Sequence, residues 1–281
     1  MQKMPIKYYA FFILPTLIAF AISFFIPFLL GIYLSFTEFR TVTNSQWVGL
    51  ANYLHAFTDN NNFLNATIFT VKFALVSVVL INVFAFSLAL LLTRAIRGTN
   101  IFRTVFFMPN LIGGIVLGYI WLLIINGILI NFDVDITYSA KYGFWGLVVV
   151  TNWQMVGYMM IIYIAGILGI SPELFEAAEI DGANSWQTLK SITIPLVMPA
   201  FTICTFLTVA NSFKLFDQNL ALTNGAPGRA SAMLALDIFH TFYGSIGTEG
   251  VGQAKAVMFT IFVAVVVLLQ LRISRSREVE I

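Results

Sequence analysis

Two apolar segments of this sequence contain polar side chains at the spacing of one helical face. The two sets are Thr151, Gln154, Met155 and Tyr158 in the first segment and Thr208, Asn211, Ser212 and Leu215 in the second. Positions i, i+3, i+4 and i+7 of a helix lie together, so each set is expected to form a stripe. Polar groups are costly in a membrane, and they normally face a bundle interior or a water-filled path.

The chemistry of these stripes suits a sugar. Amide and hydroxyl groups can hydrogen-bond sugar hydroxyls, and nearby rings such as Trp153, Phe213 and Phe216 can stack on the C–H faces of a sugar. We therefore expect the stripes to line a substrate path. The alternative is hydrogen bonding between helices, which contributes about 0.6 kcal/mol per pair on average.

The second segment also contains two charged residues, Lys214 and Asp217, which are spaced i, i+3. Each charge near the centre of a membrane costs about 2.5–3.5 kcal/mol on insertion scales. We expect an intramembrane ion pair between them, with direct contact to a solute as the alternative. The lone polar residues Asn82, Asn110 and Asn126 are expected to hold helices together.

A polar stretch, Ser171 to Pro199, lies between the two segments and reads SPELFEAAEIDGANSWQTLKSITIPLVMP. Ser171 can cap a helix, Pro172 suits its first position, and Glu173 suits the positive end of the helix dipole. Gly182 can end this helix, and Ser185 can cap a second one that Pro195 and Pro199 limit. The sequence predicts a helix-turn-helix.

One face of the first predicted helix has small side chains. Leu174, Ala177 and Ala178 fall together by the i, i+3, i+4 rule, with Glu176 and Glu179 beside them. A face of small residues allows the backbone of another protein to approach closely. The alternative is an ordinary amphipathic linker.

The composition is that of an integral membrane protein. Of the 281 residues, 59% are hydrophobic and 10% are charged, and the mean hydropathy is +0.89. Soluble domains have about 25% charged residues. The single cysteine, Cys204, allows no internal disulfide, and two histidines form no metal-ligand cluster. No nucleotide-binding motif is present, so we expect no cofactor on this chain.

Hydropathy predicts six membrane spans in one all-α domain over residues 1–281. The predicted spans are 8–36, 66–93, 104–130, 142–169, 200–222 and 254–271. Pro15 and Pro27 are expected to kink the first span. The segments 38–65, which contains the polar cluster Asp59-Asn60-Asn61-Asn62, 131–141 and 223–253 are expected to be loops outside the membrane.

The distribution of lysine and arginine predicts the orientation, because positive residues near spans favour the cytoplasm. Residues on the side of the N-terminus are Lys3, Lys7, Arg94, Arg97, Arg103, Lys190, Arg272, Arg275 and Arg277. Only Arg40, Lys141 and Arg229 fall clearly on the opposite side. Both termini and the stretch 171–199 are therefore expected in the cytoplasm, with the chain in the plasma membrane.

The stretch 171–199 resembles the EAA loop of ABC importer permeases. The matching positions are Glu176, Ala177 and Ala178, then Asp181, Gly182 and Ala183, and finally Ile192 and Pro195. Ile194 stands where the family usually has leucine. The resemblance implies a type I (MetI-like) permease of six spans, whose EAA loop forms a coupling helix in a cleft of a cytoplasmic ATPase.

The resemblance extends over nearly the whole chain, to the first permease of carbohydrate importers of the maltose, glycerol-phosphate and multiple-sugar type. The similar segments include FRTVFFMPNLIGGIVLGYIW, GQAKAVMFTIFV and SFKLFDQNLALTNGAPG, in which Ala226 stands where a third glycine is common. The resemblance implies a second homologous permease, two ATPase subunits that hold ATP and magnesium, and an extracellular solute-binding protein. It also places the sugar site on the two polar stripes, where only Tyr158 clearly matches the maltose branch.

Three alternatives remain open at this stage. The first is an ABC importer for another solute, such as glycerol phosphate or an amino acid. A phosphate ester would need a cation in the path, and only Lys214 could supply it. The second is a secondary transporter or channel without an ATPase, and the third is a membrane enzyme, for which no cluster of His, Asp or Cys is present.

Overall fold

The fold is described from a computed structural model for residues 6–41, 43–58, 62–94 and 97–276. Lys3, Arg277 and the Asp59–Asn61 part of the predicted outside loop lie outside the described residues. Contacts within the chain divide it into two compact units. We call residues 1–61 with 238–260 the N-terminal unit, and residues 62–237 with 261–281 the core unit.

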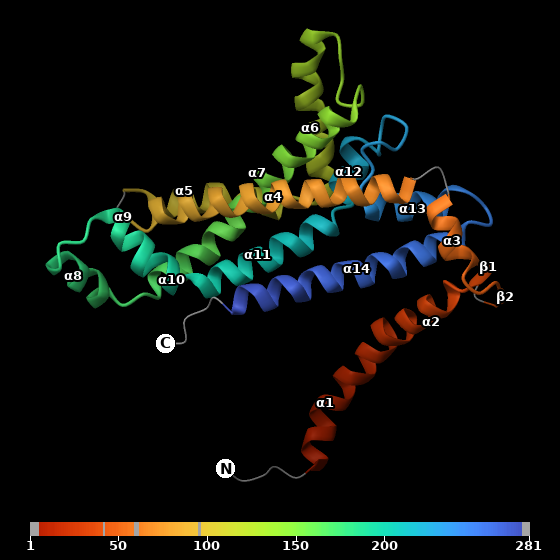
Figure 1. Cartoon of the computed structure of the whole chain (residues 1–281), viewed down its shortest axis with the longest axis horizontal. Coiled ribbons are helices and arrows are strands. Elements are labelled where there is room, and N and C mark those ends of the chain that lie inside the picture. The colour runs from red at the N-terminus through yellow and green to blue at the C-terminus, as the bar shows by residue number, and fades with distance from the viewer. Residues whose placement is uncertain (1–5, 42, 59–61, 95–96, 277–281) are drawn as a thin grey trace. The chain divides into compact units, whose positions relative to one another are not determined.

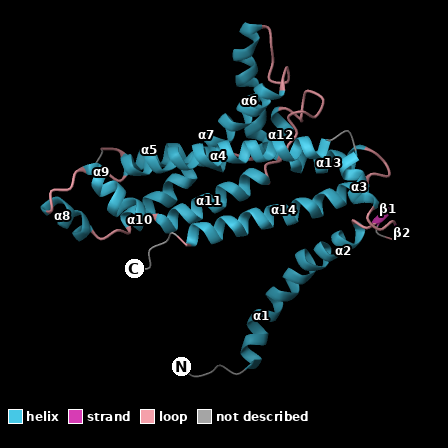
Figure 2. Ribbon diagram, in the orientation of Figure 1, coloured by secondary structure: helices cyan, strands magenta, loops and turns pink. Residues whose placement is uncertain are grey.

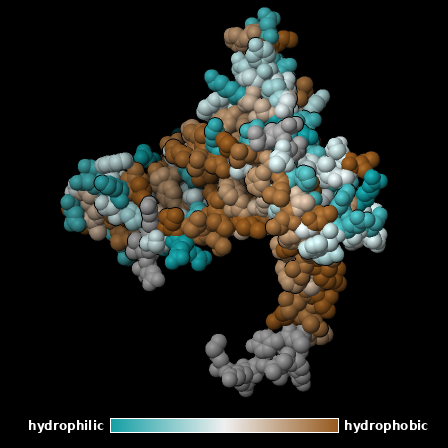
Figure 3. Space-filling view, turned by 45° about the vertical axis from the view of Figure 1, so that its right-hand side comes forward, coloured by the Kyte–Doolittle hydropathy of each residue, from teal (hydrophilic) through white to brown (hydrophobic). Residues whose placement is uncertain are grey.

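The N-terminal unit begins with an interrupted helix. Helix α1 (Ile6–Phe20) passes into a π-helical turn (Ala21–Phe25) and then into α2 (Ile26–Leu34), as Figure 1 shows. Pro27 has no N–H to donate to the preceding turn, and this accounts for the irregular hydrogen bonding before it. The helical residues Phe11–Leu34 are long and apolar enough to cross a membrane. In Figure 3 this column is covered by hydrophobic side chains.

The predicted loop 38–65 is largely structured. A hairpin of β1 (Thr37–Thr41) and β2 (Asn44–Trp47) is followed by α3 (Ala51–Thr58), and Figure 2 shows the strands in magenta. The buried Asn52 side chain donates to the carbonyl oxygens of Ser35 and Thr37, both at 2.9 Å. This amide satisfies backbone groups where the chain leaves α2, so the segment is compact.

The predicted loop 223–253 is also partly helical. It contains α13 (Leu234–Gly244) and the start of α14 (Glu249–Arg275). Gly250 and Gly252 allow α14 to approach its neighbours in the N-terminal unit, because an added Cβ at Gly250 would clash with the Thr37 carbonyl oxygen. Helix α14 is therefore longer than the span predicted over 254–271.

The core unit is organised around α4 (Asn62–Leu92), α7 (Ala140–Leu168) and α11 (Met198–Phe213). Their facing side chains form a buried core that includes Ile81, Ala85, Met159, Tyr163 and Cys204. The Tyr163 hydroxyl donates to Asn82 Oδ1 at 2.6 Å, and Asn82 Nδ2 donates to Thr208 Oγ1 at 3.1 Å. Asn82 thus links all three helices, as predicted.

The predicted third span, 104–130, is not one helix. Helix α5 (Thr99–Phe107) ends in a 3₁₀ turn (Met108–Leu111), and α6 (Gly114–Leu129) begins after an extended residue. Pro109 and the pair Gly113-Gly114 cause this break, because proline removes a backbone donor and glycine weakens a helix. Helix α5 packs on α7 instead, where an added Cβ at Gly157 would clash with the Phe106 carbonyl oxygen.

The predicted fifth span, 200–222, is also interrupted. Helix α11 starts at Met198, where it is bent by 66° from the preceding helical segment, and it ends at Phe213. After Lys214, Leu215 and Phe216 the chain enters the short α12 (Asp217–Leu222). Counting only the described residues, five helices are long and apolar enough to span a membrane, or up to six if the bent pair is one span.

Candidate functional site

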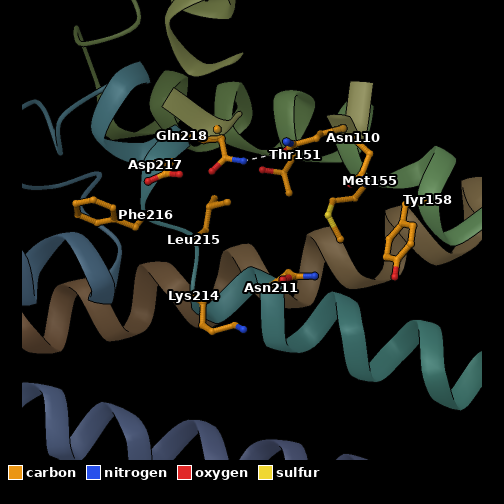
Figure 4. A pocket seen from close by; sticks show the side chains of 12 residues that line it. Asn110, Thr151, Met155, Tyr158, Asn211, Lys214, Leu215, Phe216, Asp217 and Gln218 are labelled. Atoms are coloured by element: carbon orange, nitrogen blue, oxygen red, sulfur yellow. Dashed lines mark hydrogen bonds between the residues drawn. The ribbon is translucent and has the colours of Figure 1, made fainter. Parts of the chain in front are cut away.

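A pocket of about 380 Å³ lies in the core unit where α7, α11 and the two helix breaks meet (Figure 4). Four lining residues come from the predicted stripe on α7, namely Thr151, Gln154, Met155 and Tyr158. Asn211 from α11 also lines it. The shared face predicted for the α7 stripe is therefore confirmed, whereas a role in binding solute stays a prediction.

Thr208 and Ser212, the other predicted residues of α11, do not line this pocket. Each is 1% exposed. The Thr208 hydroxyl donates to the Cys204 carbonyl oxygen at 2.8 Å and accepts from Asn82, so it serves the packing of helices. The Ser212 hydroxyl is buried and has no hydrogen-bond partner within the part of the chain that the structure describes.

The pocket contains both predicted charges, but they are not one turn apart on a helix. Lys214 follows the last residue of α11, and Asp217 begins α12. In Figure 4 the Lys214 ammonium points away from the Asp217 carboxylate. Among the described residues no ion pair joins them, and both are exposed. The prediction of an intramembrane ion pair is therefore wrong in this structure.

Leu215 of the predicted second stripe and the nearby ring Phe216 also line the pocket. Three further lining residues were not predicted for the substrate path, namely Asn110, Gly114 and Gln218. All lie at or beside the two helix breaks, which hydropathy could not locate. Asn110 was interpreted as a residue that holds helices together, and the Pro109-Asn110 and Gly113-Gly114 pairs were the available signals for a break at a functional position.

The stretch 171–199 folds as two helices at one end of the core unit (Figure 1). Helix α8 (Pro172–Ile180) has Ser171 at its N-cap position and Glu173 in its first turn, as predicted, but among the described residues the Ser171 side chain makes no capping hydrogen bond. Its end has the hydrogen bonds of a Schellman motif, from the Gly182 N–H to the Glu179 carbonyl and from the Ala183 N–H to the Ala178 carbonyl. Gly182 has a φ of +75°, which glycine adopts readily.

The second helix, α9 (Ser185–Thr188), is capped by Asn184 and not by Ser185. The Asn184 side chain accepts from the backbone N–H groups of Trp186 and Gln187, and the Gln187 side chain accepts from the Asn184 N–H at 2.8 Å. This is a capping box. Only Asp181, Gly182 and Ala183 separate the end of α8 from this cap, so the turn between the helices is closely specified.

The outward face of α8 differs from the predicted one. Ala178 is 9% exposed and faces inward, whereas Leu174 is 44% and Ile180 is 87% exposed. Ala177 and Glu176 are also exposed. The exposed apolar face therefore comprises Leu174, Ala177 and Ile180, because Phe175 and Ala178 take the inward positions.

The stretch 171–199 packs on the core of α4, α7 and α11 through residues both before and after the turn at Gly182. Phe175 of α8 and Ile192 of the π-helical turn Leu189–Thr193 pack against the same buried cluster. Pro195 lies in the short α10 (Ile194–Leu196), directly before the 66° bend. A groove of about 900 Å³, lined by residues that include Arg94, Glu179 and Trp186, separates α8 and α9 from the ends of α4 and α7. A force on α8 would thus reach the helices that line the pocket.

These features define a helical membrane permease with a polar pocket among its spans and an exposed helical hairpin at one end. Residues 97–279 match the family of binding-protein-dependent transport system inner membrane components, and the chain belongs to this family. The predicted membership in the ABC importer permeases is thereby confirmed. The family is one of transport permeases and not of enzymes.

Known proteins are similar over almost the whole chain. The chain is 46% identical to the probable starch degradation products transport system permease protein AmyD of Thermoanaerobacterium thermosulfurigenes, over 97% of this chain and 96% of that protein. It is 29% identical to the trehalose/maltose transport system permease protein MalF of Thermococcus litoralis, over 84% and 83% of the two chains.

A solved structure has the same fold. It is that of a bacterial ABC transporter involved in the import of the acidic polysaccharide alginate, with a TM-score of 0.80 and 19% sequence identity. The match covers 96% of this chain and 95% of the other. The predicted all-α, MetI-like fold is confirmed by the family match and this structure together.

Proposed function

We propose that this chain is a permease subunit of an ATP-driven importer for an oligosaccharide. The observation that carries the proposal is the pocket, in which Thr151, Tyr158 and Asn211 from two helices face one space. Hydroxyl and amide groups can bind sugar hydroxyls, and the Phe216 ring also lines the pocket. The transport of starch degradation products by the relative from Thermoanaerobacterium thermosulfurigenes supports a sugar of this kind.

The proposed complex contains a second homologous permease, two ATPase subunits that bind ATP and magnesium, and an extracellular solute-binding protein. The exposed apolar face of α8, with Leu174 and Ile180, fits a helix that docks into an ATPase. Both termini and α8 would then lie in the cytoplasm. Closure of the ATPase pair on ATP would pull on α8, and the attached core helices would reorient the pocket between the two membrane faces.

Uptake in cells tests this proposal. Cells that lack the chain would be supplied with labelled glucose, maltose, maltotriose and glycerol 3-phosphate in turn. We expect loss of uptake of one sugar or a small related set, restored by the wild-type chain. Unchanged uptake of every sugar would contradict the proposal.

A second candidate solute is a phosphate ester, which one observation favours. Lys214 is exposed and lines the pocket, so a cation is available for a phosphate. Asp217 lines the same pocket and opposes this assignment through its negative charge. Loss of glycerol 3-phosphate uptake alone, in the same experiment, would select this candidate.

A further inference from the structure

Gln154 forms a hydrogen-bonded bridge at one end of the pocket. Its Nε2 donates to the Ile112 carbonyl oxygen at 3.0 Å, and its Oε1 accepts from Gln218 Nε2 at 2.7 Å, the bond that is dashed in Figure 4. Gln154 and Gln218 are each 8% exposed. An amide has one oxygen and two N–H groups, so the oxygen and one N–H of Gln154 are already engaged. Gln154 is therefore poorly placed to act as a solute ligand.

The bridge joins the two places where helices are broken. Ile112 has extended backbone angles, φ −85° and ψ 128°, between the 3₁₀ turn and α6. Gln218 lies in the first turn of α12, directly after the break at Lys214–Phe216. Helix α7 continues unbroken past Gln154. The Gln154 side chain, on a continuous helix, thus forms hydrogen bonds to residues at two helix breaks. Breaks are the places where a membrane helix can bend.

Helices α6 and α12 form one tightly packed pair. A Cβ added at Gly114 would lie 2.7 Å from Asp217 Cβ, and one added at Gly118 would lie 2.8 Å from Ala221 Cβ. Contacts this close leave little room for the two helices to slide past each other. The pair is therefore expected to move as a body, and the Gln154–Gln218 bond is a polar link from this body to α7.

We propose that Gln154 and Gln218 are positioning residues that hold the α6–α12 pair against α7 until solute enters the pocket. The inference rests on the proposed function, in which the pocket is the transport path. Gln218 lies at one end of the pocket and Tyr158 at the other (Figure 4), and α8 and α9 lie beyond the Tyr158 end in the core unit (Figure 1). The bridge thus lies at the end of the pocket that is distant from α8 and α9.

The test uses the complete reconstituted transporter, with its second permease, ATPase subunits and solute-binding protein. Gln154→Leu, Gln218→Leu and the double variant are compared with wild type for ATP hydrolysis without solute and for the maltotriose concentration that gives half-maximal transport. Gln270→Leu is the matched control, because the Gln270 side chain donates only to Ser274 on its own helix, among the hydrogen bonds described.

We expect Gln218→Leu to raise hydrolysis without solute about fivefold, the population shift that loss of one hydrogen bond typically produces. Gln154→Leu removes the bonds to both Ile112 and Gln218, so it should raise hydrolysis at least as much. The half-maximal maltotriose concentration should change less than about twofold, and the double variant should resemble Gln154→Leu because both changes break one bridge. Gln270→Leu should resemble wild type.

A different pattern would overturn the inference. If Gln154 were a solute ligand, Gln154→Leu would raise the half-maximal maltotriose concentration and leave hydrolysis without solute unchanged. Gln218→Leu would then change neither measurement. If the leucine variants do not assemble, Gln218→Glu decides the question at constant shape, because it sets two acceptor oxygens against each other and should raise hydrolysis without solute; no rise would contradict the bridge. A wild-type complex that maltotriose does not stimulate would refute the sugar proposal alone, since hydrolysis without solute still reports the bridge.

Discussion

Gly182 offers the sharpest test of the coupling helices, because the cost of replacing it comes from the backbone alone. Its φ is +75°, and a Cβ added there would meet no atom within 4 Å. Gly182→Ala therefore creates no clash, and it costs about 1–2 kcal/mol for holding an L-residue in the left-handed region. A cost of this size lowers the ratio of the native turn to its alternatives about 5- to 30-fold.

Asparagine tolerates the left-handed region better than alanine, so Gly182→Asn should destabilise the native turn less than Gly182→Ala does. The matched control is Gly228→Ala, because Gly228 has a φ of +52°, also has open space around it, and lies in the loop before α13. The control has a similar backbone cost but lies outside the coupling stretch.

The assay is ATP hydrolysis by the reconstituted complex with and without solute and binding protein. We expect Gly182→Ala to lower stimulated hydrolysis by up to about 5- to 30-fold. Gly182→Asn should lower it less, and Gly228→Ala should leave the stimulation by solute intact. Equal behaviour of Gly182→Ala and Gly228→Ala would refute the reasoning, as would a larger loss with asparagine than with alanine.

Three further predictions follow from other contacts. Asn184→Ala removes the capping box of α9, which typically costs about 1 kcal/mol, and should lower stimulated hydrolysis; unchanged stimulation would show that α9 is not needed for coupling. Asn211→Ala should raise the half-maximal sugar concentration for transport, and an unchanged value would remove Asn211 from the path. Asn82→Leu breaks the bonds to Tyr163 and Thr208, about 0.6 kcal/mol each on average, and should lower the unfolding temperature in detergent, whereas an unchanged temperature would show that these bonds add no net stability.

The helices of the stretch 171–199 could be predicted in detail because their signals are local. Ser171, Pro172 and Glu173 mark a helix start, and Gly182 marks its end, within a few residues. Asn184 was missed as the second cap because Ser185 is an equally good cap by residue type, and only the Gln187 side chain completes the capping box at Asn184.

The pocket was only partly predictable because it depends on where helices break. The stripe on α7 lies on a continuous helix, so its spacing gave the correct face. The stripe on α11 ends at Phe213, and hydropathy does not distinguish a continuous apolar helix from one that breaks at Lys214. The Lys214–Asp217 pair was misjudged for that reason.

The bridge at Gln154 could not be predicted from spacing at all. A glutamine that binds solute in a pocket and a glutamine that hydrogen-bonds residues at two helix breaks can occupy the same position in a helical pattern. The difference comes from Gln218 and from the Ile112 carbonyl, which are distant in sequence. Only the tertiary arrangement decides which groups of the amide remain for a solute.

The most direct test of the central claim is solute uptake into proteoliposomes that contain the purified complete complex and enclosed ATP, with all ion gradients dissipated. We predict that the vesicles accumulate labelled maltotriose when ATP and the solute-binding protein are present, and that accumulation stops when ATP is replaced by a non-hydrolysable analogue. Accumulation that requires an ion gradient and not ATP, or no accumulation of any sugar, would contradict the account.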